Sequence, residues 1–376
     1  MSTSAETNFA EPRGNELPEF REALNFIYKF ESALSSEQAA QDWKPPPLEE
    51  GHRGRYLWTD AFGVIDFLTL YGLTSQPHFL TFARTLIETV HDVLGRTRDG
   101  SRRLPGATDQ NPVGGGLRIG KLAESGPDGD GQYHHYLTIW MFALNRYSVA
   151  ASDSRYNTLA IQLAKAIHPR FVTNRGTSRP RISWKMSMDL TRPLVPSQGN
   201  LDPFDGYVVF GLLDQHKTGG VQGLKDEISD YKEIIHLLWS GYHSSDPLDL
   251  GMTLWTVHWK LDEEWARHMK GRALVGLRQL EEYGEFDNPP GYRLAFREFG
   301  SVMGVKCHDE LATEPYWRPR WINKVLEAWK TAGQVPVPKK DSRLKSTLAP
   351  ITEVMYSAAL IPGAFRKGWM EDHVKR

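Results

Sequence analysis

Apolar residues recur every three or four positions along most of this chain, which is the spacing of one face of an α-helix. One set of such segments is amphipathic, with polar residues on the opposite face: 18–34, 76–94, 154–171, 224–242, 262–283 and 318–330. Alternation bounded by two-residue turns, the pattern of hairpin strands, is weak outside the connections between these segments. The pattern therefore predicts an all-α protein.

A second set of predicted helices is apolar or rich in small residues on nearly every side. These helices span 58–73, 133–150, 202–215, 246–260, 293–305 and 350–365, and each follows an amphipathic one, giving six pairs. A helix that is apolar all round is buried on most sides. Glycine costs a helix about 1 kcal/mol relative to alanine, so repeated small residues indicate close helix–helix contact. They are Gly63, Ala143, Gly206, Gly211, Gly251, Gly300, Gly304, Ala358 and Ala359.

Two concentric rings of six helices satisfy both patterns, with the amphipathic helices outside and the buried helices inside. This arrangement is an (α/α)6 toroid, or barrel, of six helical hairpins. The links that leave the amphipathic helices are often long and polar, so we expect them to gather at the N-terminal ends of the inner helices. The predicted organisation is a single barrel domain over 17–365, a disordered N-terminal tail over 1–16 and a C-terminal tail over 366–376.

Two of the inner-helix starts share the pattern D-P-x-D, at 202–205 and 246–249. Aspartate at the N-cap, proline at the first helical position and an acid in the first turn satisfy the unpaired backbone N–H groups of a helix start. We therefore expect Asp202 and Asp246 to act as caps. Asp205 and Asp249 lie further into the first turn and can project into the mouth of the barrel, where the helix start favours their ionised form.

Two further acids occupy helix starts. Asp60 follows Thr59, the natural cap of its helix, and is left for a functional role. Glu298 adjoins Arg297, and this pair is either a buried structural ion pair or a general acid/base with an arginine that holds substrate. The catalytic candidates are therefore Asp60, Asp205, Asp249 and Glu298.

Ionisable and aromatic residues of the long links are candidates for binding substrate. Consecutive histidines on a helix point about 100° apart, so at most one of His134 and His135 faces a central pocket, and a polar core histidine is the alternative. GGLRIGK (115–121) fits G-x-x-x-x-G-K, but Leu122 replaces the magnesium-binding Ser or Thr, so we expect Arg118 on a mouth loop instead of a nucleotide site. The binding candidates are Arg118, Asp130, His134, His135, Trp184, Lys185, Tyr207, Trp255 and Arg297.

Composition narrows the class of partner. The chain has 45 basic and 46 acidic residues with no basic block, which argues against a nucleic-acid surface. The lone Cys307, with no CxxC or HExxH, argues against a disulfide framework and a zinc site, so no metal or cofactor is expected. The N-terminus lacks a secretory apolar region and no run could span a bilayer, which predicts a cytoplasmic protein without a membrane partner.

Acids at the inner-helix starts occur in WTDAFG, GDGQYHH, LDPFDG, PLDLG and FREFG. With six hairpins over about 17–365, the chain resembles the six-hairpin glycosidase-like superfamily. That resemblance is one of architecture, and it implies a carbohydrate-active site in the mouth of the barrel. Abundant Trp, Tyr and Phe near the polar links would suit a ring-shaped ligand.

The leading hypothesis is a glycoside hydrolase that uses paired carboxyl groups on a sugar-like small molecule. One alternative is a sugar epimerase or isomerase, or a cyclase of secondary metabolism, working in the same acidic, histidine-containing and aromatic pocket. The other alternative is a non-catalytic barrel that only binds a small molecule.

Overall fold

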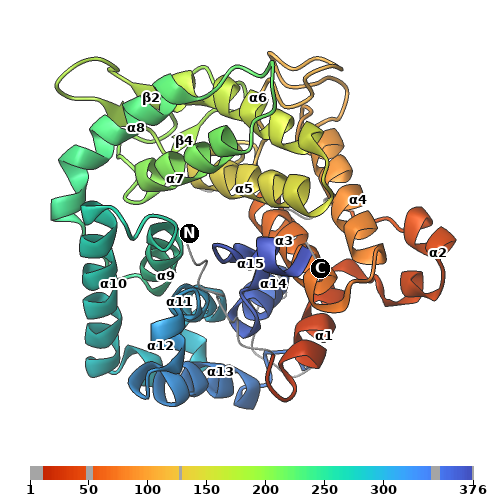
Figure 1. Cartoon of the computed structure of the whole chain (residues 1–376), viewed down its shortest axis with the longest axis vertical. Coiled ribbons are helices and arrows are strands. Elements are labelled where there is room, and N and C mark those ends of the chain that lie inside the picture. The colour runs from red at the N-terminus through yellow and green to blue at the C-terminus, as the bar shows by residue number, and fades with distance from the viewer. Residues whose placement is uncertain (1–11, 48–53, 127–128, 340–347, 375–376) are drawn as a thin grey trace, which may run out of the picture.

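The computed structural model describes residues 12–47, 54–126, 129–339 and 348–374, and most of these residues are helical, which confirms the all-α class. The amphipathic segments form α1 (Glu16–Tyr28), α4 (His78–Val93), α6 (Ser154–Phe171), α8 (Lys225–Leu238), α10 (Glu264–Glu282) and α13 (Ile322–Thr331). The apolar segments form α3 (Leu57–Thr74), α5 (His134–Ala150), α7 (Asp202–Gln215), α9 (Pro247–Val257), α11 (Ala295–Lys306) and α14 (Ala349–Leu360). Both sets are labelled in Figure 1 where there is room.

Several predicted helices are shorter than their apolar patterns. The segment expected to run to 365 ends as a helix at Leu360, since Pro362 disfavours helical backbone at the residue before it. Additional short helices are α2 (Glu37–Asp42), α12 (Asp309–Thr313) and α15 (Trp369–Val374), with tighter single turns at Glu31–Ser35, Trp239–Gly241, Glu285–Asp287, Pro290–Tyr292 and Gly363–Phe365 and a wider one at Tyr316–Trp321.

Helix α15 lies in the segment that the sequence assigns to a C-terminal tail. Trp369 and Met370 are buried, and the Trp369 ring lies against Gly72 of α3. The last turns of the chain therefore pack on the domain. Residues 1–11 of the expected N-terminal tail lie outside the described ranges, and α1 begins at Glu16.

The apolar helices contact one another in chain order. Helix α3 contacts α5, α5 contacts α7, α7 contacts α9, α9 contacts α11 and α11 contacts α14, and α14 contacts α3 in turn. Five of them also contact the amphipathic helix before or after them in the chain, such as α4 on α3 and α10 on α9, and α14 contacts α1. In Figure 1, α10 and α13 lie at the edge of the molecule, outside α9 and α11.

Small residues permit close approach at most of the predicted positions. A Cβ atom added to Gly251 of α9 would lie 2.2 Å from the carbonyl oxygen of Gly300 in α11, and one added to Gly304 would lie 2.1 Å from the carbonyl oxygen of Gly251. Gly63 and Gly206 instead face the rings of Tyr28 and Tyr231 on amphipathic helices. Gly211 is the exception, with no atom within 4 Å of such a Cβ.

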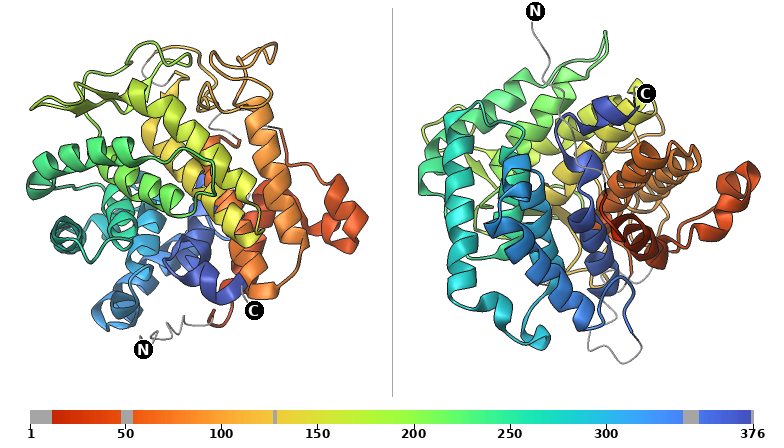
Figure 2. Two further views of the ribbon diagram at one scale, coloured as in Figure 1. Left: turned by 45° about the horizontal axis from the view of Figure 1, so that its top comes forward. Right: turned by 60° about the horizontal axis from the view of Figure 1, so that its bottom comes forward.

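The long links are held together by four two-residue strands. β1 (Gln132–Tyr133) pairs antiparallel with β4 (Lys185–Met186), and β2 (Val172–Thr173) pairs with β3 (Arg181–Ile182). The first pairing joins the link before α5 to the link before α7, and the left view of Figure 2 shows these links at one end of the molecule. The N-terminal ends of α5 and α7 are thereby set beside each other.

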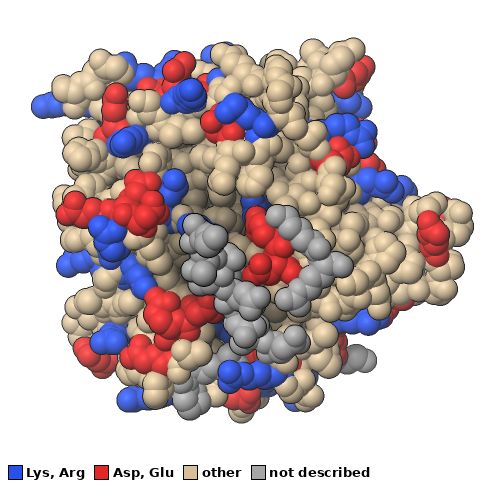
Figure 3. Space-filling model, in the orientation of Figure 1, with Lys and Arg blue, Asp and Glu red and all other residues tan. Residues whose placement is uncertain are grey.

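Charged side chains of both signs are interspersed over the face shown in Figure 3. No helix among the described residues has an apolar stretch that could cross a membrane.

The contact between α9 and α11 provides a test of the packing. Gly251→Ala would place a methyl group against helix backbone that cannot rotate away, so we expect unfolding free energy to fall by about 2 kcal/mol or more. Gly271→Ala is the matched control, because Gly271 is an exposed residue of α10 with open space at its Cβ, and it should gain about 0.5–1 kcal/mol. Urea unfolding followed by circular dichroism measures both. Equal effects of the two substitutions would contradict the close approach.

Candidate functional site

A cavity of about 500 Å³ lies at the N-terminal ends of the six apolar helices, each of which contributes lining residues. The lining residues on helices are Trp58, His135, Tyr136, Thr138, Ile139, Asp202, Asp205, Leu248, Asp249, Met252, Trp255, Phe296, Arg297 and Ile351. Links and caps add Tyr56, Lys121, Asn200, Leu201, Asp246 and Leu348. The predicted convergence of helix starts on one polar pocket therefore holds for the described residues.

All four aspartates of the two D-P-x-D segments line this cavity. Asp202 and Asp205 come from the first turn of α7, and Asp246 and Asp249 come from the cap and first turn of α9. The proline that follows the first Asp of each segment is compatible with the first helical turn because its missing N–H is unpaired there in any helix. Two identical local patterns on neighbouring helices thus bring four carboxyl groups to one place.

The prediction that Asp202 caps its helix is wrong. The N-cap position belongs to Leu201, and the Asp202 carboxylate faces α5, with Oδ1 at 3.3 Å from Nδ1 of His134 and 3.6 Å from Nδ1 of His135. Burial opposes ionisation of Asp202, but hydrogen bonding to the two histidines and their charge outweigh it, so the pKa of this carboxyl lies below its usual range. Asp202 is therefore an ionised carboxylate in the cavity wall.

The two histidines point in different directions, as their helical spacing predicts. His135 lines the cavity, with its ring 5.8 Å from that of Trp58. His134 is fully buried behind the wall, where its Nε2 lies 2.6 Å from the hydroxyl of Tyr231 in α8. Of these two binding candidates only His135 lines the cavity, in agreement with the prediction that at most one of the pair faces a central pocket, and His134 is the polar core histidine given as the alternative.

Asp205 is buried in the cavity wall and accepts a hydrogen bond of 2.6 Å from Oγ1 of Thr256 in α9. Burial raises the pKa of Asp205 well above its usual value, and the negative charges of Asp202 and Asp249 raise it further. The expectation that the helix start keeps Asp205 ionised is wrong, because the cost of burying its charge beside other carboxylates is larger. The surroundings of Asp205 therefore favour its acid form.

Asp249 and Asp246 lie on the other side of the cavity. Asp249 accepts hydrogen bonds of 3.1 Å from both Tyr242 and Asn200, and burial raises its pKa despite these bonds. Asp246 caps α9 as predicted, accepting from the backbone N–H groups of Leu248 and Asp249, and its second oxygen pairs with Arg297. Arg297 is thus brought to the cavity by Asp246.

Aromatic side chains form much of the remaining wall. The ring of Trp58 lies 5.3 Å from that of Tyr136, and Phe296 and Trp255 line other parts of the cavity. Trp255 is fixed because its Nε1 donates a hydrogen bond of 3.1 Å to the carbonyl of Phe365. Trp255, a predicted binding residue, is therefore confirmed as part of the lining.

Two predicted catalytic acids lie outside the cavity. Asp60 pairs with Arg55 at 2.7 Å and accepts from the hydroxyl of Tyr28 in α1. Glu298 pairs with Arg293 and accepts a hydrogen bond of 2.8 Å from Nε1 of Trp329 in α13. Burial raises the pKa of both acids, and the arginines oppose that effect.

The reason for this difference is the direction in which each helix presents its first turn. In α3 and α11 the acid faces an outer helix, and in both cases its partner is an arginine five residues earlier in the chain. The alternative of a buried ion pair thus holds for Glu298, with Arg293 as partner in place of Arg297.

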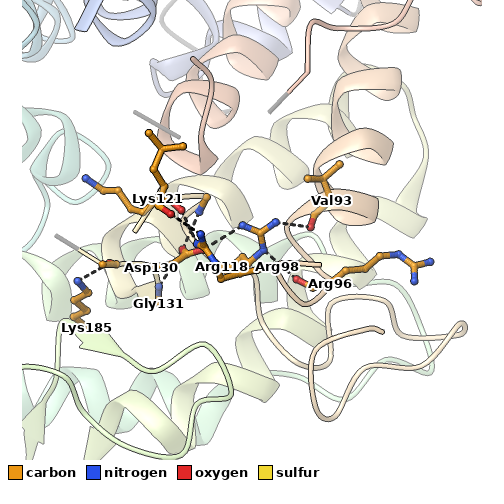
Figure 4. Close-up of polar contacts among 11 residues, drawn as sticks. Val93, Arg96, Arg98, Arg118, Lys121, Asp130, Gly131 and Lys185 are labelled. Atoms are coloured by element: carbon orange, nitrogen blue, oxygen red, sulfur yellow. Dashed lines mark hydrogen bonds and ion pairs between the residues drawn. The ribbon is translucent and has the colours of Figure 1, made fainter. Parts of the chain in front are cut away.

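Arg118 and Asp130 hold a loop together and do not line the main cavity (Figure 4). Asp130 is buried and pairs with Arg98 at 3.0 Å and Arg118 at 3.1 Å, while its other oxygen accepts from the backbone N–H groups of Gly120 and Gly131. These contacts join the two ends of the link before α5. Their effect on the cavity is to place Lys121 at its edge.

Three other predicted binding residues have structural contacts instead. Trp184 donates to Ser197, and Tyr207 donates to Glu263. Lys185 is buried, and its Nζ donates a hydrogen bond of 2.9 Å to the carbonyl oxygen of Gly129. None of the three lines the cavity.

Sequence reasoning missed Asp202, which was expected only to cap its helix, and Asn200 as lining residues. A signal for Asp202 was present, since His134 and His135 are the only adjacent histidine pair in the chain and Asp202 opens the next apolar helix. Within the described ranges no group of three or more His, Cys, Asp or Glu side chains is arranged to hold a metal ion.

The raised pKa of Asp205 predicts a specific pH dependence of stability. Its folded-state pKa is raised, so between the unfolded value near 3.8 and the folded value the folded protein binds more protons, and stability falls as pH rises. Asp205→Asn removes that loss, so its melting temperature should match wild type at pH 4 and exceed it at pH 7.5. Differential scanning calorimetry across this range, with the exposed Asp226→Asn as control, measures the difference. If the melting temperature of Asp205→Asn exceeds that of wild type by the same amount at every pH, the raised pKa of Asp205 is contradicted.

The cavity, its four aspartates and its aromatic walls are therefore the feature from which a function can be inferred. Lys121 and Arg297 add two basic side chains at its edge. Comparison with protein-family models and with curated proteins finds no match to this chain.

Proposed function

We propose that the six helix pairs form an (α/α)6 barrel of the six-hairpin glycosidase-like kind. The chain-order contacts of the apolar helices, and the contact of α14 with α3, support this architecture. Support also comes from the cavity, to which the starts of all six apolar helices contribute. In such a barrel the cavity is the mouth where long links and helix N-termini meet.

We further propose that the protein is a glycoside hydrolase acting on a small sugar-like substrate. The observation that carries this proposal is the pair of first-turn aspartates on α7. Burial raises the pKa of Asp205, whereas the contacts with His134 and His135 lower the pKa of Asp202 in the same cavity. Carboxyl groups whose surroundings push their pKa values apart are the usual means of dividing acid and base roles.

Asp205 is assigned as the general acid. It donates its proton to the oxygen of the glycosidic bond as that bond to the anomeric carbon breaks, and it becomes a carboxylate. The new negative charge is stabilised by the hydrogen bond from Thr256. Asp205 then recovers a proton from solvent before the next turnover.

The base is the dyad of His135 and Asp202. Nδ1 of His135 faces Asp202, so Nε2 is the ring nitrogen through which His135 exchanges a proton with the cavity. A water molecule attacks the anomeric carbon and gives its proton to Nε2, and the Asp202 carboxylate stabilises the resulting imidazolium. Direct attack by water inverts the configuration at the anomeric carbon.

The remaining lining is suited to a sugar ring. Apolar faces of the ring can lie against Trp58, Tyr136 and Trp255, as sugars do on aromatic side chains. Asn200, Arg297 and Lys121 supply polar groups for hydroxyl groups at the edge of the ring.

Release of nitrophenol from a panel of nitrophenyl glycosides tests the assignment. Asp205→Asn should lower kcat by about 10²–10⁴-fold, and His135→Gln should lower it by about 10²-fold or more, because each removes a proton-transfer group. Asp226→Asn, an exposed first-turn aspartate of α8, should leave kcat unchanged. Proton NMR of the first-formed product should show inversion. Full activity of Asp205→Asn towards a natural disaccharide would refute the role of Asp205 as acid.

A second candidate function is isomerisation, epimerisation or acid-started cyclisation in the same cavity. It is favoured because Asp205, whose pKa is raised by burial, lines a cavity with aromatic walls, which can stabilise positive charge on carbon.

The two functions differ in the fate of water. Turnover in H₂¹⁸O should place ¹⁸O at the anomeric carbon of the product if the protein is a hydrolase, as mass spectrometry can measure. Product of unchanged mass, formed without ¹⁸O, would instead support isomerisation or cyclisation, in which Asp205→Asn should again be inactive.

A further inference from the structure

A second cavity, of about 390 Å³, lies at the opposite ends of the inner helices. Its lining includes Arg146 in the C-terminal half of α5, Gln215 at the end of α7, Trp259 just after α9 and Glu371 of α15. On α5, Arg146 is eleven residues beyond His135, which corresponds to about 16 Å along the helix axis. This cavity is therefore distinct from the one that contains the aspartates.

Three buried polar atoms around this cavity have no hydrogen-bond partner within the described chain: Nη1 of Arg146, Nε1 of Trp259 and Oε2 of Glu371. They lie close together, since the Arg146 guanidinium is 5.3 Å from the Trp259 ring and its Nη1 is 3.9 Å from the nearer Glu371 oxygen. Leaving a buried donor or acceptor unpaired costs about 1–3 kcal/mol for each group. Two donors and one acceptor without partners thus belong to residues that line the same cavity.

Arg146 has little negative charge around it for so buried a cation. Its side chain is 1% exposed, and its other guanidinium nitrogens donate to the neutral amide oxygen of Asn145. Burial lowers the pKa of Arg146 to about 10, which the distant Glu371 only partly offsets, so it remains charged at neutral pH.

The rest of the lining also favours an anion. Lys260 and Lys367 border the cavity with Arg146, against the acids Asp262 and Glu371, so basic groups are in excess. Lys367 is held there because its Nζ donates 3.2 Å to the carbonyl of Trp259. Gly211 leaves space on the α7 side, where no atom lies within 4 Å of an added Cβ.

We propose that this cavity is a binding site for a small hydroxycarboxylate. The carboxylate of the ligand accepts hydrogen bonds from Nη1 of Arg146 and Nε1 of Trp259, and the neighbouring hydroxyl group donates to Oε2 of Glu371. This pairing satisfies all three unpartnered atoms at once, and it does not depend on the reaction proposed for the other cavity.

Glycerate is a suitable probe, with acetate and glycerol as probes that carry only one of its two functions. Isothermal titration calorimetry of the full chain should show saturable binding of glycerate, at least about tenfold weaker binding of acetate, and none of glycerol. A tenfold change in Kd corresponds to about 1.4 kcal/mol. The titration can therefore detect the loss of one hydrogen bond between ligand and protein. Binding should also raise the melting temperature, by an amount that grows with the logarithm of ligand concentration above Kd.

Trp259→Phe removes the indole N–H while keeping an aromatic ring beside Arg146, and it should weaken glycerate binding about tenfold. Trp239→Phe, a half-buried tryptophan at the end of α8, is the matched control and should bind as wild type does. Lys121→Met, at the edge of the other cavity, should also leave Kd unchanged and so places the ligand away from the aspartates.

Three results would overturn the proposal. They are an absence of glycerate binding by folded wild type, equal affinity for acetate and glycerate, and equal loss of affinity in Trp259→Phe and Trp239→Phe. The first would mean that the cavity holds water only. None of these results bears on the activity of Asp205, which is measured separately with glycosides.

Discussion

The interaction on which the site depends is the contact of the Asp202 carboxylate with His134 and His135. It joins the first turns of α7 and α5, and through His134 and Tyr231 it also reaches α8. Because this contact keeps Asp202 ionised, a fixed negative charge stands in the same cavity as Asp205 and helps to hold the proton there. One contact therefore joins two helices and adds to the effect of burial in raising the pKa of the neighbouring acid.

Burial alone does not decide which acids can do chemistry in this protein. Asp60, Glu298, Asp205 and Asp249 all occupy the first turn of an apolar helix, and burial raises the pKa of each. Asp60 and Glu298 are bound by arginines and by a tyrosine or tryptophan of an outer helix, which leaves them as structural ion pairs. Asp205 and Asp249 are bound by neutral donors and remain able to exchange protons with a molecule in the cavity.

The two cavities at opposite ends of the inner helices have opposite electrostatic character. Aspartates surround the N-terminal cavity, where the helix dipole favours negative groups, and the basic side chains of the second cavity lie near helix C-termini, where it favours positive ones. Helices α5 and α7 contribute residues to both cavities, and Trp259 of the second cavity follows the end of α9. The same two helices thus form part of the walls of two chemically different cavities.

The helices and their degree of burial could be predicted from the sequence alone. Helical periodicity is a local property, so the six amphipathic and six apolar helices could be predicted, as could the close approach at Gly251 and the cap at Asp246. Convergence of polar helix starts on one pocket followed from the alternation of the two helix types. These features depend on residues a few positions apart, and the sequence contains that information directly.

Which first-turn acid faces the cavity could not be predicted from local sequence, because it depends on tertiary packing. Asp60 and Asp205 each occupy the fourth position of their helices, yet one faces Tyr28 of α1 and the other faces the cavity. That difference is a rotation of each helix about its own axis, set by packing against distant segments such as the Tyr28 and Tyr231 rings at Gly63 and Gly206. The pKa of Asp205 also depends on tertiary packing, because the negative charge that raises it includes a contribution from Asp249 on another helix.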